Sequence, residues 1–144
     1  MQGDWQLTVG SQGDQPGQFN FPTGLALTPD DAFLLVADSH NQRVAVLRAT
    51  DGAWVRAQTG PFGTLVWPRY VTVVPSTGEV LVSDIDLHQV VRFRSTDDDL
   101  VVGTLGTGQG GGPTELNDPM GMVVLESNVF PSVSLLICLL IYFC

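Results

Sequence analysis

Two histidines and two aspartates are the strongest candidates in this sequence for residues that do chemistry. Asp38 and Asp84 each end an apolar run, and His40 and His88 follow them by two and four residues. Imidazole and carboxylate groups are ligands of transition metals, and a metal centre would need several such turns to converge on one point. The sequence offers only two turns of this kind, so we expect His40 and His88 to be polar residues of solvated turns.

Carboxylate clusters and a glycine run are the other candidates. Asp84 with Asp86, and residues 97–99, offer acidic oxygens, but neither group has the glycine and the distal glutamate of an EF-hand loop. Residues 106–112 are rich in glycine like a phosphate-binding loop, but they lack its lysine and its strand–loop–helix context. The sequence therefore predicts no catalytic residue, no metal ligand and no cofactor.

The charge balance limits the class of partner. The 144 residues include 15 acids and six bases, all of them arginine, which gives a net charge of −9. Such a surface repels phosphate backbones and disfavours nucleic-acid binding. Hydrophobic residues make up 44% of the chain, which is enough for a buried core in one domain. We therefore expect a folded chain with a protein partner, which the residues do not identify.

The two ends of the chain bear on its location. Residues 1–9 lack the basic and apolar segments of a secretory signal, so the cytoplasm is the expected compartment. Both cysteines, Cys138 and Cys144, lie in the apolar stretch 135–144, which is shorter than the roughly 20 residues of a membrane-spanning helix. Three interpretations of this tail stay open: read-through or an alternative exon end, an apolar strand, and a tail anchor that touches a membrane through residues 129–144.

Alternating apolar residues predict the strands that would position these turns. No stretch shows helical apolar spacing over three turns, and proline, glycine and aspartate separate the alternating runs. The expected strands cover residues 24–28, 33–37, 43–47 and 53–57 in a first unit, and 70–74, 79–83, 89–93 and 100–104 in a second. The aromatic residues Trp54, Trp67 and Tyr70 are expected to pack within and between these units.

The two groups of strands are copies of one unit. Residues 22–51 align with residues 68–97 without a gap at a spacing of 46, and nine of the thirty positions are identical. Average composition would give about two identities by chance. A third copy begins at Pro119. Four short antiparallel strands in a repeat of this length are typical of a β-propeller blade, so the predicted fold is all-β, with blades of an incomplete propeller.

The first unit resembles the NHL repeat. It reads Pro-Thr-Gly-Leu-Ala-Leu from Pro22, then an apolar strand that ends in Val-Ala-Asp at Asp38, then Asn41 and Arg43. The second unit departs from this pattern, because Tyr70 stands where glycine is expected and Leu-His-Gln replaces Asn-x-Arg. The matching units extend over about residues 5–125.

Each repeat-motif residue has an expected structural role. Asp38 and Asp84 should accept backbone N–H groups in the turns that follow them, and Arg43 should reach back to Asp38 as an ion pair. Gly24 and Gly121 should begin innermost strands, where blades crowd and a Cβ does not fit. The full set is Pro22, Gly24, Asp38, Asn41, Arg43, Pro68, Asp84, Pro119 and Gly121.

The repeat divides the chain into five segments. Residues 1–21 are expected to hold the last strand of a preceding blade, over residues 5–9, and a lead-in. Residues 22–67 and 68–118 are the first and second repeats, residues 119–128 start a third, and residues 129–144 are an apolar tail. Propellers close with about four to eight blades, so we interpret the chain as a fragment of a longer protein. Uncovered blade faces and open edges predict self-association.

The resemblance implies a binding module. NHL propellers present loops at one rim that contact a protein or, in some ubiquitin-ligase relatives, an RNA. The leading interpretation is a non-catalytic module for protein interaction or scaffolding. One alternative is part of a six-bladed propeller enzyme, a metal-dependent lactone hydrolase or lyase with its metal in the central channel. The other is the substrate-recognition part of an NHL ubiquitin ligase.

Overall fold

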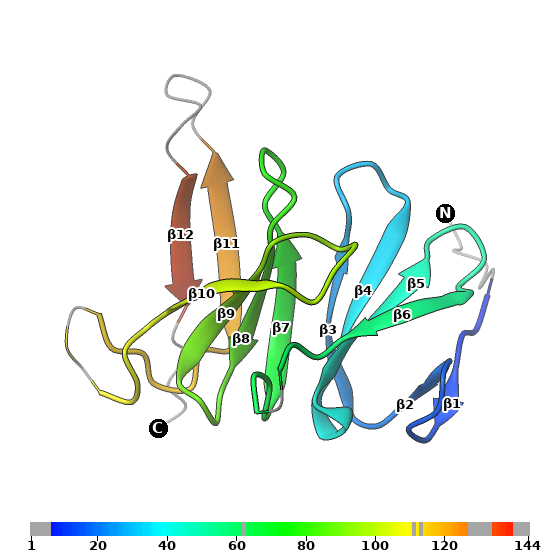
Figure 1. The fold of residues 1–144 in the computed structure, drawn as a ribbon, viewed down its shortest axis with the longest axis horizontal. Helices are drawn as coiled ribbons and strands as arrows, with labels where there is room; N and C mark the ends of the chain where they lie inside the picture. The colour runs from blue at the N-terminus through cyan, green and yellow to red at the C-terminus, as the bar shows by residue number, and fades with distance from the viewer. Residues whose placement is uncertain (1–6, 62, 111, 113, 127–133, 140–144) are drawn as a thin grey trace, which may run out of the picture.

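The chain folds into β-sheets that stand side by side like an open fan (Figure 1). A computed structural model describes residues 7–61, 63–110, 112, 114–126 and 134–139. Two sheets have four antiparallel strands each, and two smaller sheets have two strands each. Among the described residues, the one helical element is a single 3₁₀ turn, η1, at Ser39–Asn41. The sheets do not close into a ring, and the predicted all-β blades are confirmed.

The two four-stranded sheets are the two predicted blades. The first has the order β3-β4-β5-β6 and the second has β7-β8-β9-β10, with antiparallel pairing throughout. All eight expected strands are present, and each lies within two residues of its expected bounds. Their bounds are Pro22–Leu27 (β3), Phe33–Asp38 (β4), Arg43–Arg48 (β5), Trp54–Gln58 (β6), Pro68–Val73 (β7), Val80–Asp84 (β8), Gln89–Phe93 (β9) and Val101–Leu105 (β10).

The small sheets lie before and after the blades. The strands β1 (Ser11–Gln12) and β2 (Gln18–Phe19) form a short parallel pair in the lead-in. The strand expected over residues 5–9 is wrong for its described part, because residues 7–9 pair with no sheet. After the second blade, β11 (Gly121–Glu126) pairs antiparallel with β12 (Ser134–Leu139).

The tail therefore contains a strand, as one of its three interpretations expected. Its other residues, 129–133 and 140–144, lie outside the described residues. No helix in the described part of the chain is long and apolar enough to cross a membrane.

The main core lies between the two blades. Leu35, Val44 and Val46 of the first blade pack with Val82 and Phe93 of the second, and each is at most 1% exposed. Because successive residues of a strand point to opposite faces, each blade has two apolar faces. One face of the second blade packs on the first blade, and the other packs on β11 through the cluster that includes Met122.

The inner strands β3 and β7 meet at Gly24. A Cβ atom added to Gly24 would lie 2.8 Å from the carbonyl oxygen of Arg69 and 2.8 Å from the Cα atom of Tyr70. The expectation that only glycine fits at the start of this inner strand is confirmed for Gly24. It is wrong for Gly121, where an added Cβ meets nothing within 4 Å, because no described strand lies against that side of β11.

Candidate functional site

A buried carboxylate organises one rim of the first blade. Asp38 is fully buried at the end of β4 and accepts hydrogen bonds from Asn20 N at 2.7 Å and Asn41 Nδ2 at 2.8 Å. Arg43 Nε donates to the same carboxylate at 2.8 Å, so the expected ion pair is confirmed. The backbone N–H group comes from the lead-in rather than from the turn after β4, which corrects the expected partner. We call Asp38, Asn41 and Arg43 the first clamp.

Arg43 extends the first clamp along the lead-in. Its Nη1 donates to the carbonyl oxygen of Asp14 and its Nη2 to that of Gln18, both at 2.8 Å. Its guanidinium carbon lies 4.9 Å from the ring centroid of Trp54, a geometry suited to a cation–π contact. These hydrogen bonds attach the chain before β3 to the turn after β4. The three residues of the first clamp therefore have structural roles, and Trp54 packs within the blade as predicted.

The second blade has the same carboxylate without its cation. Asp84 is fully buried and accepts hydrogen bonds from Val66 N at 2.8 Å, Trp67 N at 3.0 Å and Leu87 N at 3.1 Å. The position equivalent to Arg43 is occupied by Gln89. Burial raises the pKa of Asp84 above its ordinary value, although the backbone N–H groups oppose this rise. The carboxylate is thus held by peptide groups instead of a guanidinium.

Restoring the missing cation should stabilise the second blade. Between pH 3.8 and the raised pKa of Asp84, the folded state binds more protons than the unfolded state, so stability falls as pH rises through that window. Gln89→Arg should reduce this fall and raise the free energy of unfolding at pH 7 by about 1.5 kcal/mol, the value of a hydrogen bond to a charged group. Urea titrations at several pH values measure both effects. Gln109→Arg, on an exposed loop, is the control, and equal changes in the two variants would contradict the prediction.

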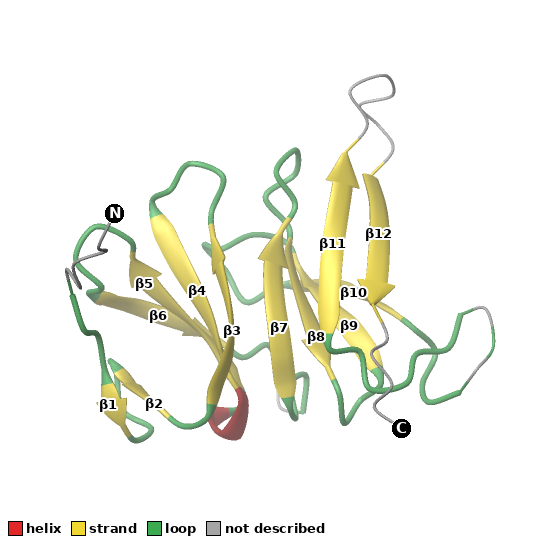
Figure 2. Cartoon of the chain, turned by 180° about the vertical axis from the view of Figure 1, so that it is seen from behind, coloured by secondary structure: helices red, strands yellow, loops and turns green. Residues whose placement is uncertain are grey.

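Three aromatic rings gather on the same rim, where the two blades meet. The rings of Phe21 and His40 stack with centroids 4.9 Å apart, and Trp67 meets His40 edge-on at 4.9 Å and Phe21 at 6.4 Å. The guanidinium carbon of Arg69 lies 6.0 Å from the Phe21 ring centroid. These residues come from the lead-in, from η1 and from the segment around the start of β7, which lie at one end of the blades (Figure 2). We call Phe21, His40 and Trp67 the rim cluster.

The rim cluster differs from what the sequence predicts. His40 is exposed, as a residue of a solvated turn should be, but its ring stacks on another ring instead of pointing freely into solvent. Trp67 joins the rim, whereas Tyr70 packs against the cluster between the second blade and β11, as predicted. Phe21 was not anticipated at all. Its side chain is 51% exposed and its backbone has a φ of 57°, in the left-handed region.

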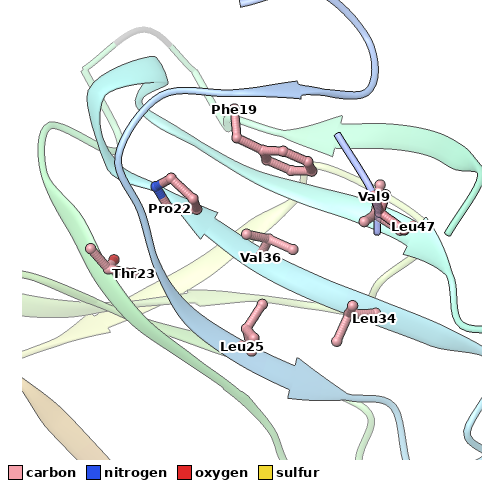
Figure 3. A pocket seen from close by; sticks show the side chains of 8 residues that line it. All are labelled: Val9, Phe19, Pro22, Thr23, Leu25, Leu34, Val36 and Leu47. Atoms are coloured by element: carbon pink, nitrogen blue, oxygen red, sulfur yellow. The ribbon is translucent and has the colours of Figure 1, made fainter. Parts of the chain in front are cut away.

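An apolar hollow lies on the free face of the first blade. It has a volume of about 250 Å³, and its lining is apolar except for Thr23 (Figure 3). Leu25, which lines it, is 61% exposed. The lining residues are Val9, Phe19, Pro22, Thr23, Leu25, Leu34, Val36 and Leu47. These side chains offer apolar contact and no acid, base or nucleophile.

The other histidine and two of the clustered aspartates pair with single oppositely charged or ionisable side chains. His88 Nδ1 lies 3.2 Å from a carboxylate oxygen of Asp118. Asp98 pairs with Arg94, whose guanidinium holds the pKa of that carboxyl below its usual value, and Asp99 lies 3.6 Å from Arg56. Within the described residues, no three His, Cys, Asp or Glu side chains are grouped so that they could hold a metal ion.

Comparison with known proteins assigns part of this arrangement. The NHL repeat family matches residues 19–47, from β2 into β5. The fold is similar to hydrazine synthase of Kuenenia stuttgartiensis, with 17% identity and a TM-score of 0.57 over 83% of this chain and 29% of that chain. No curated protein matches the sequence.

Two other solved structures are similar with lower TM-scores. One is the nidogen/laminin complex, at 17% identity and a TM-score of 0.50, covering 60% of this chain and 30% of that chain. The other is the dihydro-heme d1 dehydrogenase NirN, at 16% identity and a TM-score of 0.50, covering 78% of this chain and 22% of that chain. The chain spans less than a third of each of these proteins, and the likeness concerns the fold alone. Residues 19–47 are therefore an NHL repeat, set in the first of two blades of β-propeller type.

Proposed function

We propose that the chain is a non-catalytic protein-interaction module that binds its partner at the rim cluster. The observation that carries this proposal is the conformation of Phe21. An aromatic side chain that is 51% exposed is held on a residue with a φ of 57°. Left-handed backbone costs a residue with a Cβ about 1–2 kcal/mol, and such strain is concentrated at binding sites.

The chemistry of the rim cluster suits a protein ligand. Aromatic and arginine side chains are enriched at protein interfaces, because they bring a large apolar area with little loss of conformational entropy. Here Arg69 lies beside Phe21, and Trp67 supports the stacked pair of rings from the neighbouring blade. The net charge of −9 favours a partner with a basic surface over one with phosphate groups.

Replacing Phe21 should separate binding from stability. Asparagine tolerates left-handed backbone better than phenylalanine. In Phe21→Asn the relief of about 1–2 kcal/mol of backbone strain therefore offsets the loss of ring contacts worth about 0.5–1.5 kcal/mol. We expect the free energy of unfolding to change by less than about 1 kcal/mol. Binding should weaken about 30-fold, which corresponds to a hot-spot contribution of about 2 kcal/mol.

The experiment uses peptides selected from a random display library on the folded wild-type chain. Their affinities are then measured by calorimetry for the wild type, for Phe21→Asn and for Val55→Asn. Val55 is 42% exposed on β6, away from the rim cluster, and is the matched control. Peptides that bind Phe21→Asn as tightly as wild type, or a library that yields no binder, would refute the proposal.

A further inference from the structure

The 46-residue repeat pairs each residue on one side of the first blade with an equivalent residue in the second blade, so their exposed fractions can be compared. Leu25 is 61% exposed, whereas its equivalent in the second blade, Val71, is 0% exposed. Leu27 is 52% exposed, and its equivalent Val73 is 7% exposed. In the second blade this face is buried because it packs on the first blade. We call this side of a blade the leading face, and in the first blade it consists of Leu25, Leu27, Leu34, Val36 and Leu47. Val36 and Leu47 are at most 4% exposed, because Phe19 and Trp54 pack against them, so the uncovered part of this face is the strand edge with Leu25 and Leu27.

At the other end of the described chain, the side of β11 that points away from the second blade is uncovered. Met122 and Val124 of β11 pack against the second blade, as a leading face does, while Val123 is 42% exposed on the other side of the strand. Gly121 begins the same strand and has open space where its equivalent, Gly24, has the backbone of β7. We call the side of a blade opposite its leading face the trailing face, and in β11 it includes Gly121 and Val123. It has the form of a strand-docking position that no described strand fills.

A leading face and a trailing face already meet inside this chain. At the boundary of the two blades, Val71 and Val82 of one leading face pack on Leu35 and Val44 of a trailing face, with β7 seated against Gly24. The described chain thus presents an uncovered part of a leading face, at Leu25 and Leu27, and an uncovered trailing face at the opposite end. Residues 22–27 of β3 and residues 121–124 of β11 include no charged side chain that would oppose such a contact.

We propose that a second copy of this chain docks head to tail, with its leading face on the trailing face of the first copy. Its β3 approaches Gly121 as β7 approaches Gly24, and Leu25 and Leu27 become buried as Val71 and Val73 are. The contact joins two different surfaces, so it is heterologous, and copies can add at both ends. The apolar hollow of about 250 Å³ lies within this interface.

Two variants test the two surfaces separately. Gly121→Val adds a side chain to open space, so it leaves the fold of one chain intact but blocks the approach of β3. Leu25→Glu places a charge on the leading face. Sedimentation of the full chain should show concentration-dependent association in the wild type, and each variant should weaken it at least tenfold. Val55→Glu, 42% exposed on β6, is the control and should associate like the wild type.

Mixing the two variants identifies the geometry. Leu25→Glu keeps its trailing face and Gly121→Val keeps its leading face, so an equal mixture should form a heterodimer that neither variant forms alone. A wild type that stays monomeric overturns the proposal, and so does association that Gly121→Val does not change. If only Leu25→Glu weakens association and mixing restores nothing, two leading faces pair with each other, which also overturns it. Circular dichroism verifies the fold, and Leu25→Thr replaces Leu25→Glu if that variant unfolds.

Discussion

Replacing Asp38 with alanine should lower the free energy of unfolding by about 3–5 kcal/mol. The change leaves the Arg43 guanidinium, which is only 8% exposed, without its counter-charge, and breaking a buried ion pair on one side has a cost of this size. It also removes the acceptor for Asn20 N. Because a domain is stable by only about 5–15 kcal/mol, the first blade should be largely unfolded in mild urea. Tryptophan fluorescence reports this directly, since Trp54 lies under Arg43.

An exposed ion pair supplies the control for Asp38→Ala. Asp51 lies 3.0 Å from Arg48, and both side chains are at least half exposed, so Asp51→Ala should cost less than about 1 kcal/mol. The double variant Asp38→Ala with Arg43→Leu should be more stable than Asp38→Ala alone, because it leaves no buried charge unpaired. Equal losses for Asp38→Ala and Asp51→Ala would show that the first clamp does not hold the blade.

Gly24→Val should destabilise the contact between the blades by about 3 kcal/mol, the upper part of the range for overpacked sites. Its Cβ would lie 2.8 Å from both the Arg69 carbonyl oxygen and the Tyr70 Cα atom, and backbone atoms cannot rotate away as a side chain can. Relief requires β3 and β7 to separate. That separation would also lengthen the 2.8 Å hydrogen bond from the Thr23 hydroxyl to the Arg69 carbonyl.

The same substitution at the equivalent glycine is the matched comparison for Gly24→Val. In Gly121→Val the new side chain meets nothing within 4 Å, and valine favours strands more than glycine does, so the free energy of unfolding should not fall. Both variants are unfolded in urea at high dilution, so that association does not contribute. Equal free energies of unfolding for Gly24→Val and Gly121→Val would contradict the prediction that the close approach of β3 and β7 leaves room only for glycine at position 24.

The local parts of this structure could be predicted from the sequence. The strands follow from alternation of apolar residues, and the four-stranded unit follows from the repeat, since both are properties of neighbouring residues. The ion pair between Asp38 and Arg43 was also predictable, because these residues flank one turn. In the second blade Gln89 stands where Arg43 stands in the first, so the sequence excludes this ion pair at Asp84. It does not reveal that Trp67 N and Leu87 N donate to the Asp84 carboxylate as well as Val66 N, the equivalent of Asn20 N.

Contacts between loops could not be predicted in this way. Phe21, His40 and Trp67 lie in three separate connections, and only the packing of one blade on the next brings their rings together. The role of a glycine is similar, because it depends on the strand that faces it. Gly24 and Gly121 occupy the same place in the motif, yet of the two only Gly24 has the backbone of another described strand against the position of its Cβ atom. No motif position distinguishes these two surroundings.

The first clamp also bears on the order in which the chain folds. Its hydrogen bond from Asn20 joins residues 18 apart, whereas the Thr23 hydroxyl joins the two blades across 46 residues. Closing the longer loop costs about 0.8 kcal/mol more in conformational entropy, so we expect a blade with its clamp to form before two blades meet. Each repeat is then a kinetic unit as well as a structural one. A gene duplication that adds one repeat would add its own short-range clamp, while its apolar faces would still need a neighbouring blade to be buried.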